Sequence, residues 1–433
     1  MYFTLLIIVS FATASLILAS SFIHIPEWST VLGSIIILLL LTAILLKENN
    51  HRTRVISILL SVLSIAWGVY SSFISPYWNS ETLRDISGSN YQSTLNQQAR
   101  IPSDQAKSDI LFCRQKISRI HPLCINGLDN TLDSCFNEAL NAVNRKDSIS
   151  VNELYLLMQK AVASLKDAHT RVYAINNSLR LANYSDCEEI LEFDNMPFDS
   201  LVKEKLPLIS YESDDWAANQ IDRRLRNVDG IQSLGFSLDK GISVMYRSED
   251  IVQEALFTES DFKQKQSVTY SMNADRIGGY TLLDSINTAY LKLDNCYYYK
   301  LRSIHRFNKG MRTMFSEIKD RGIANLILDL RDNPGGNQAI SFEFFKYLPI
   351  KEYNCGRIQM RRGPFVIHSN GIRKNRINKK LCFPGNIYVL TSLNTFSAAV
   401  IFADMLQGNN LAIVIGETPG NAATSHTNII HFV

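Results

Sequence analysis

Two segments in the C-terminal third of this 433-residue chain constrain its fold more than any other feature. Residues 326–336 (LILDLRDNPGG) and 389–399 (VLTSLNTFSAA) each begin with an apolar, β-branched run, continue into a turn and lead into helical spacing. That pattern predicts two buried strands followed by helices, which is typical of a parallel α/β sheet. The turns that follow such strands meet at one edge of the sheet, where these folds place their functional sites.

Ser397 lies at the predicted start of the second helix, which should cover residues 397–407 and end at Gly408 as a C-cap. Unpaired N–H groups and the positive end of the helix dipole gather there, so an oxyanion forming beside the hydroxyl would be stabilised. The alternative is an ordinary N-cap, the commonest role of a serine before a helix. Residues 333–336 could likewise have a functional or an ordinary structural role, because they would also suit a tight turn before a helix over 338–348.

Together the two segments resemble the carboxyl-terminal processing (tail-specific) protease and tricorn-core serine peptidase family, in which an Asp-Leu-Arg-x-Asn-x-Gly-Gly strand-turn precedes a Thr-x-Ser-Ala nucleophile turn. Residues 411–420 (LAIVIGETPG) resemble the next family landmark, and residues 164–172 (SLKDAHTRV) resemble its Leu-x-Asp-x-His-Thr segment. These landmarks follow in family order within residues 105–433. The resemblance implies a crotonase-like α/β serine peptidase core that cleaves peptides or proteins.

The resemblance implies Ser397 as the nucleophile and leaves two ways of activating it. One branch uses a lysine in a turn after the third landmark, but this chain has Asn421 there, and an amide does not titrate near neutral pH. The other branch uses the histidine of the Asp-x-His-Thr segment, here His169. An imidazole ordinarily titrates near pH ~6.5, so it can accept and return a proton. We therefore predict the histidine-dependent branch.

The resemblance also places the oxyanion hole at the N–H of Ala398 and at that of either Gly335 or Gly336. Two departures favour a rival function, a catalytically inactive peptidase-like domain that binds peptides or scaffolds a membrane complex. Ala168 stands where the tricorn-type site has a serine, and the acidic residue expected downstream is not reached before Val433. We therefore expect residues 276–433 to form a C-terminally incomplete core.

The N-terminal region predicts a membrane anchor. Residues 1–23, 30–46 and 55–75 are apolar and almost uncharged, each near the ~17–25 residues that cross a bilayer. We expect three transmembrane helices within residues 1–78. The basic residues of 47–54 should stay in the cytoplasm, which directs the peptidase domain to the periplasmic or extracellular side of the cell membrane.

Three further regions are expected between the anchor and the core. The polar residues 79–103 predict a linker, and residues 104–180 predict a small helical subdomain that carries His169. His121, before a proline in this subdomain, is interpreted as structural and as a rival base only if His169 fails. Residues 181–275 are expected to bridge to the core without a PDZ signature. The core should begin with a strand at 276–283 and a crossover helix at 307–319.

The composition and the spacing of its cysteines and histidines limit the cofactors and partners that we expect for this chain. Seven cysteines allow bridges in an exported domain, for example among Cys113, Cys124 and Cys135 or between Cys355 and Cys382. No Cys or His spacing predicts a metal site, so we expect no metal and no cofactor. A net charge of +3 is too small and dispersed to indicate nucleic acid. The expected partners are a peptide or protein substrate and the lipid bilayer; the oligomeric state and cleavage preference stay open.

Overall fold

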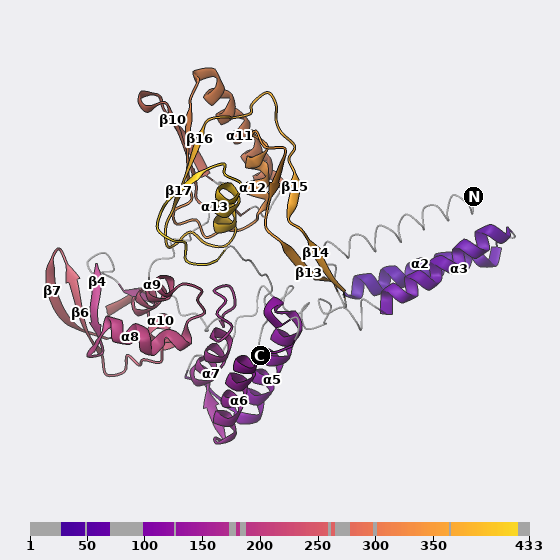
Figure 1. Cartoon of the computed structure of the whole chain (residues 1–433). Helices are drawn as coiled ribbons and strands as arrows, with labels where there is room; N and C mark the ends of the chain where they lie inside the picture. The colour runs from indigo at the N-terminus through magenta and orange to yellow at the C-terminus, as the bar shows by residue number, and fades with distance from the viewer. Residues whose placement is uncertain are drawn as a thin grey trace. The chain divides into compact units, whose positions relative to one another are not determined.

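A computed structural model describes residues 27–47, 50–69, 98–124, 127–172, 179–181, 188–258, 261–264, 278–297, 301–362 and 365–422 (Figure 1). The chain divides into two compact units. One comprises residues 1–92, 357–370 and 428–433, and the other comprises residues 93–356 and 371–427. The first predicted apolar run, residues 1–23, lies outside the described residues.

In the smaller unit, helices α2 (Glu27–Lys47) and α3 (His51–Val69) pack against each other and bury Ile37, Leu41 and Ile44 (Figure 1). Many of their other large apolar side chains are exposed: Ile35, Ile36, Leu39, Leu40, Leu46, Val55, Ile56, Ile58, Leu59, Val62, Leu63 and Ile65. None of the described helices combines the length and the apolar character needed to span a membrane. The same unit contains the antiparallel hairpin β13 (Ile358–Arg362) and β14 (Phe365–Ser369).

The predicted helical subdomain is built from three helices and a small antiparallel pair of strands. They are α5 (Ser103–Ile120), α6 (Asn130–Asn144), α7 (Val151–Ala163), β1 (Arg100–Pro102) and β2 (Ser148–Ser150). The helix starts follow from local side chains, because the Asp129 carboxylate caps α6 and Ser150 forms a capping box with Glu153 at α7. The chain leaves α7 into the loop that carries His169.

The region expected to be a bridge forms an α+β layer with its own hydrophobic core. Its sheet has the order β5-β4-β6-β7 and is antiparallel throughout. The strands are β4 (Glu189–Phe193), β5 (Met196–Pro197), β6 (Ile242–Ser248) and β7 (Ile251–Phe257), and the helices are α8 (Phe198–Lys205), α9 (Asp214–Leu225) and α10 (Val228–Ser233). Phe193, Leu201 and Ile221 are fully buried in this layer. Beside it, β3 (Leu179–Leu181) pairs with β8 (Phe262–Gln264).

The core contains a five-stranded sheet of order β17-β16-β11-β10-β9, in which only β9 runs antiparallel to its neighbour (Figure 1). The strands are β9 (Gly278–Leu283), β10 (Thr288–Leu293), β11 (Asn325–Asp329), β16 (Asn386–Thr391) and β17 (Ile413–Gly416). The helices are α11 (Leu301–Arg321), α12 (Ala339–Phe345) and α13 (Ala398–Gly408), and β12 (Glu352–Asn354) pairs with β15 (Ile372–Lys374). Buried phenyl rings of Phe315, Phe344 and Phe402 pack together inside it.

This sheet confirms the α/β core that the sequence predicts. Because β11 and β16 are parallel neighbours, the turns that follow them lie at the same end of the sheet. One predicted cap was wrong: Gly408 is the last residue of α13, and Asn409 caps the helix instead. The Asn409 side-chain amide donates to the Met405 carbonyl at 2.7 Å, which satisfies one carbonyl of the last turn.

The described cysteines do not form the bridges that an exported domain allows. Cys113, Cys135, Cys296, Cys355 and Cys382 carry free thiols, and no disulfide joins two of the described cysteines. Burial raises the pKa of the Cys113 and Cys296 thiols to about 12, so both stay protonated and unreactive at neutral pH.

Candidate active site

Ser397 lies in a strained turn between β16 and α13. Its backbone has φ 54° and ψ −122°, a conformation that a residue with a Cβ rarely adopts. The side chain makes no capping hydrogen bond to α13, so the N-cap alternative does not describe what the hydroxyl does. A strand, a strained turn and a helix together form the arrangement that exposes a nucleophilic serine in hydrolases.

Three hydrogen bonds hold this turn in place. The Thr395 hydroxyl donates to the Leu330 carbonyl at 2.8 Å, and the Phe396 N–H donates to the Asn333 carbonyl at 2.9 Å. The Ser397 N–H donates to the side-chain oxygen of Asn421 at 2.8 Å. The turns after β11 and β16 are therefore joined directly, and Asn421, whose amide cannot act as a base, lies against the Ser397 turn.

The two glycines after β11 permit a close approach to Ser397. Gly335 has φ +85°, and a Cβ there would lie 2.6–2.8 Å from the Phe396 carbonyl oxygen, the Ser397 Cβ and the Ala398 nitrogen. Gly336 has φ +138°, and a Cβ there would meet the Cys296 backbone at 2.5 Å. Only glycine fits either position, because a side chain would be both strained and in collision.

The hydrogen bonds distinguish the two glycines as donors. The Gly335 N–H donates to the Asn333 side chain at 2.9 Å and is therefore engaged. Within the part of the chain that the structure describes, neither the Gly336 N–H nor the Ala398 N–H makes a hydrogen bond. Ala398 is the first residue of α13, where helical N–H groups have no acceptor of their own.

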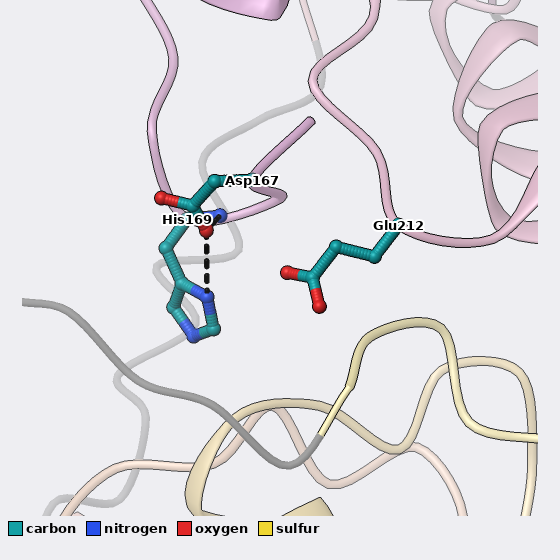
Figure 2. Close-up of side chains that lie close together, drawn as sticks. All are labelled: Asp167, His169 and Glu212. Atoms are coloured by element: carbon teal, nitrogen blue, oxygen red, sulfur yellow. Dashed lines mark hydrogen bonds and ion pairs between the residues drawn. The ribbon is translucent and has the colours of Figure 1, made fainter. Parts of the chain in front are cut away.

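The structure brings His169 to the nucleophile turn. Its imidazole packs against the phenyl ring of Phe396, the residue before Ser397, with ring centroids 4.8 Å apart and an interplanar angle of 38°. The imidazole Nδ1 lies 3.5 Å from Asp167 Oδ1, which Figure 2 shows as a facing pair. The two predicted residues are thus neighbours of one phenyl ring although the chain separates them widely.

Asp167 is the centre of a buried network. Its carboxylate accepts hydrogen bonds from the His169 N–H at 3.0 Å, from His121 Nε2 at 3.1 Å and from the Thr170 hydroxyl. Burial alone would raise the pKa of Asp167, but the hydrogen bonds from His121, His169 and Thr170 hold it well below its ordinary value. Asp167 therefore stays ionised, and His121 contacts Oδ2, the carboxylate oxygen other than the one that lies 3.5 Å from His169 Nδ1.

Two residues that no sequence motif indicated complete the surroundings. Glu212, just before α9, accepts hydrogen bonds from the Ala168 N–H at 3.2 Å and from the Ala422 N–H at 2.7 Å. Its carboxylate points toward His169 and Asp167 (Figure 2). Trp216, in the first turn of α9, stacks on Phe396. The only local signal near them is Ser213, an N-cap that predicts a helix start and nothing about the site.

Asp167, His169 and Glu212 could also hold a metal ion, since each offers a ligand atom and these atoms all lie within 4.8 Å of one another. Imidazole and carboxylate donors suit Zn²⁺. Backbone N–H groups and the His121 and Thr170 side chains already engage the carboxylates, however. A hydrogen-bond network around His169 therefore accounts for the close approach of Asp167, His169 and Glu212.

Comparison with known proteins agrees with this geometry. Residues 287–430 match the sequence model of Peptidase family S41. Solved structures with the same fold include mature CPAF in complex with lactacystin, with 13% identity, a TM-score of 0.53 and coverage of 75% of this chain and 86% of that chain. Mature CPAF alone has 13% identity, a TM-score of 0.51 and coverage of 73% and 84%. No curated protein sequence gives a significant match.

Residues 287–430, which hold Ser397, belong to the region that matches Peptidase family S41, and this match supports a serine-type peptidase, a hydrolase of peptides or proteins. The family match covers β10 to β17 and the turns that hold Ser397, Gly335 and Gly336. At 13% identity, the likeness to CPAF shows a shared fold.

Proposed function

We propose that this chain is an endopeptidase in which Ser397 is the nucleophile and His169 is the general base. The observation that carries the proposal is the contact of the His169 imidazole with Phe396, directly beside the strained backbone of Ser397. Asn421 supports the histidine-dependent branch, because an amide occupies the position of the lysine base and binds the Ser397 backbone instead.

In the first step, His169 takes the hydroxyl proton while Ser397 Oγ bonds to the substrate carbonyl carbon, and the carbonyl π electrons move to its oxygen. The Ala398 and Gly336 N–H groups would donate to that oxyanion, each worth ~2.7–4 kcal/mol of transition-state stabilisation. As the intermediate collapses, His169 gives the proton to the leaving amine. Water then releases the acyl group from Ser397 by the same sequence.

Asp167 has the orienting role in this scheme. Its ionised carboxylate faces Nδ1 of His169, which favours the tautomer that carries the proton there and leaves Nε2 for the Ser397 hydroxyl. The same negative charge stabilises the imidazolium that forms in the transition state.

The test is hydrolysis of an unstructured protein such as casein by the wild type, Ser397→Ala, His169→Ala and His305→Ala. His305 is exposed on α11 and provides a matched control for loss of an imidazole. We expect Ser397→Ala and His169→Ala to retain less than about one-thousandth of the wild-type kcat, and His305→Ala to retain all of it. Full turnover by His169→Ala would assign the proton transfer to another base.

We further propose that a multi-pass N-terminal anchor holds the peptidase at the outer face of the cell membrane. The proposal is supported by the three apolar runs, by the basic residues of 47–54 and by the apolar side chains that α2 and α3 expose. It predicts that the full chain stays with membranes after alkaline carbonate washing and that protease added outside intact cells reaches the peptidase domain. Release by carbonate, or protection of the domain from external protease, would contradict it.

A further inference from the structure

We infer that Glu212 is a positioning residue whose carboxylate joins the loop of His169 to the loop that holds Ser397. The inference rests on the roles proposed for those two residues. It assigns to the α+β layer, which has no family landmark, a direct part in assembling the site.

The hydrogen bonds of Glu212 reach two distant segments. One carboxylate oxygen accepts from the N–H of Ala168, 44 residues away in sequence and adjacent to His169. The other accepts from the N–H of Ala422, 210 residues away, at 2.7 Å. Hydrogen bonds to an ionised acceptor are about twice as strong as neutral ones, so this carboxylate is a firm connection between the segments.

The second of these segments leads directly to the nucleophile. Ala422 follows Asn421, which is almost fully buried and whose side-chain oxygen accepts from the Ser397 N–H. A short path of hydrogen bonds therefore runs from the backbone beside His169, through Glu212, to the backbone of Ser397. Displacement of a reacting group by 1 Å can cost about 10²-fold in rate, so the length of this path matters for catalysis.

Packing around the same segment fixes Glu212 itself. Trp216 stacks on Phe396, and a Cβ at Gly420 would lie 1.9 Å from the Trp216 indole, so the loop before Asn421 packs directly on this ring. Ser213, the residue after Glu212, accepts the Trp216 N–H and is the N-cap of α9. Glu212 thus lies in the bend directly before a capped helix.

Glu212 also changes the charge near His169. Among the described residues, the carboxylates of Asp167 and Glu212 lie beside the imidazole, and the ligand atoms of Asp167, His169 and Glu212 lie within 4.8 Å of one another (Figure 2). His121 contacts the same Asp167 carboxylate at 3.1 Å. A glutamine at position 212 removes one of the two negative charges. It also replaces one acceptor with an N–H₂ group that cannot receive a backbone N–H.

The test compares Glu212→Gln with Glu204→Gln, an exposed glutamate in the same layer, in peptide hydrolysis and in labelling by a fluorophosphonate. We expect kcat and the labelling rate of Glu212→Gln to fall about 10- to 100-fold with KM changed less than about twofold. The acid limb of its kcat/KM profile should move to lower pH, because the imidazolium of His169 loses a neighbouring charge. Glu204→Gln should match the wild type in every measurement.

The outcomes separate this inference from the proposed function. If Ser397→Ala is labelled as fast as the wild type, the nucleophile assignment falls, whatever Glu212→Gln does. If labelling requires Ser397 but Glu212→Gln keeps the wild-type kcat and pH profile, only the inference is overturned. If Glu212→Gln does not fold, the same measurements are made on Glu212→Asp. Its shorter side chain keeps the charge but not both hydrogen bonds, so kcat should fall with an unmoved acid limb, and a wild-type kcat would refute the positioning role.

Discussion

Trp216 stacks on Phe396, the residue before Ser397, with ring centroids 5.5 Å apart and an interplanar angle of 17°. The same phenyl ring contacts the His169 imidazole at 4.8 Å. An indole, a phenyl ring and an imidazole from three distant segments therefore form a continuous row beside Ser397. This row explains how the α+β layer, which contains none of the family's landmarks, can control the site.

We predict that Trp216→Ala costs both stability and activity. Trp216 is 6% exposed, so its replacement by alanine leaves a cavity and should lower the free energy of unfolding by about 3–5 kcal/mol. Phe396 also loses the indole that stacks on it. Trp216→Phe keeps an aromatic face and should lose less of both. Urea unfolding and kcat measured on the same samples check this. A Trp216→Ala variant with normal kcat under conditions where it is fully folded would show that the aromatic row does not position Phe396.

Gly335→Ala should nearly abolish activity, because the new Cβ would collide with Ser397 Cβ and the Ala398 nitrogen. We expect kcat/KM to fall at least about 10²-fold, since Ser397 and Ala398, the proposed nucleophile and oxyanion donor, must both shift. Steady-state hydrolysis of a peptide substrate measures this.

Gly356→Ala is the matched control for that variant. Gly356 has φ +86°, nearly the φ of Gly335, and its N–H donates to Asn354 at 2.9 Å just as Gly335 donates to Asn333. A Cβ at Gly356 meets nothing within 4 Å. Equal losses of activity in both variants would attribute the effect to backbone strain and would contradict the collision.

We predict that Asp109→Asn stabilises the protein at neutral pH. Asp109 lies on α5 and is 9% exposed, and burial raises its pKa to about 6. Burial favours the protonated carboxyl in the folded state. Below the ordinary pKa of ~3.9 the side chain is therefore accommodated without a penalty, and this advantage is lost as the pH rises through about 6 and the buried group ionises. The free energies of unfolding should coincide near pH 4 and differ by about 3 kcal/mol at pH 8 in favour of Asp109→Asn. A constant difference across this range would contradict the assignment, and Asp104→Asn on the same helix is the control.

Ionised Asp329 should stabilise the folded protein, and this contribution to the free energy of unfolding should be lost in acid. It is fully buried at the end of β11, where burial alone would raise its pKa, but hydrogen bonds from Arg331 and Tyr290 lower it to about 2. The stability of the ionised form is present above pH ~3.9 and is lost as the pH falls toward 2. Asp329→Asn should therefore cost about 2 kcal/mol at pH 7 and progressively less from pH 4 to pH 2. Urea midpoints at pH 7, 5 and 3 measure the difference, and a gap that widens in acid would refute it.

The sequence predicted the core sheet because its central strands are apolar and followed by recognisable turns. The apolar runs that open residues 326–336 and 389–399 lie in β11 and β16, and the helix after Ser397 begins within one residue of its predicted start. The crossover helix α11 extends beyond the predicted 307–319 at both ends, since its first and last turns carry little of the apolar periodicity.

The α+β layer and its contribution to the site could not be predicted in this way. Its strand β7 is largely exposed, and β4 has an irregular register between Ile190 and Glu192 that breaks the alternation of apolar and polar residues. Glu212 and Asn421 act through backbone N–H groups of segments far away in sequence. Such contacts depend on tertiary packing, and no local spacing encodes them.

The most direct test of the central claim is to treat the protein with a fluorophosphonate and to locate the adduct by mass spectrometry of its peptides. The account predicts an adduct on Ser397 in the wild type, none in Ser397→Ala, and at least about 10³-fold slower labelling in His169→Ala. An adduct on a different serine, or a His169→Ala variant labelled as fast as the wild type, would contradict it.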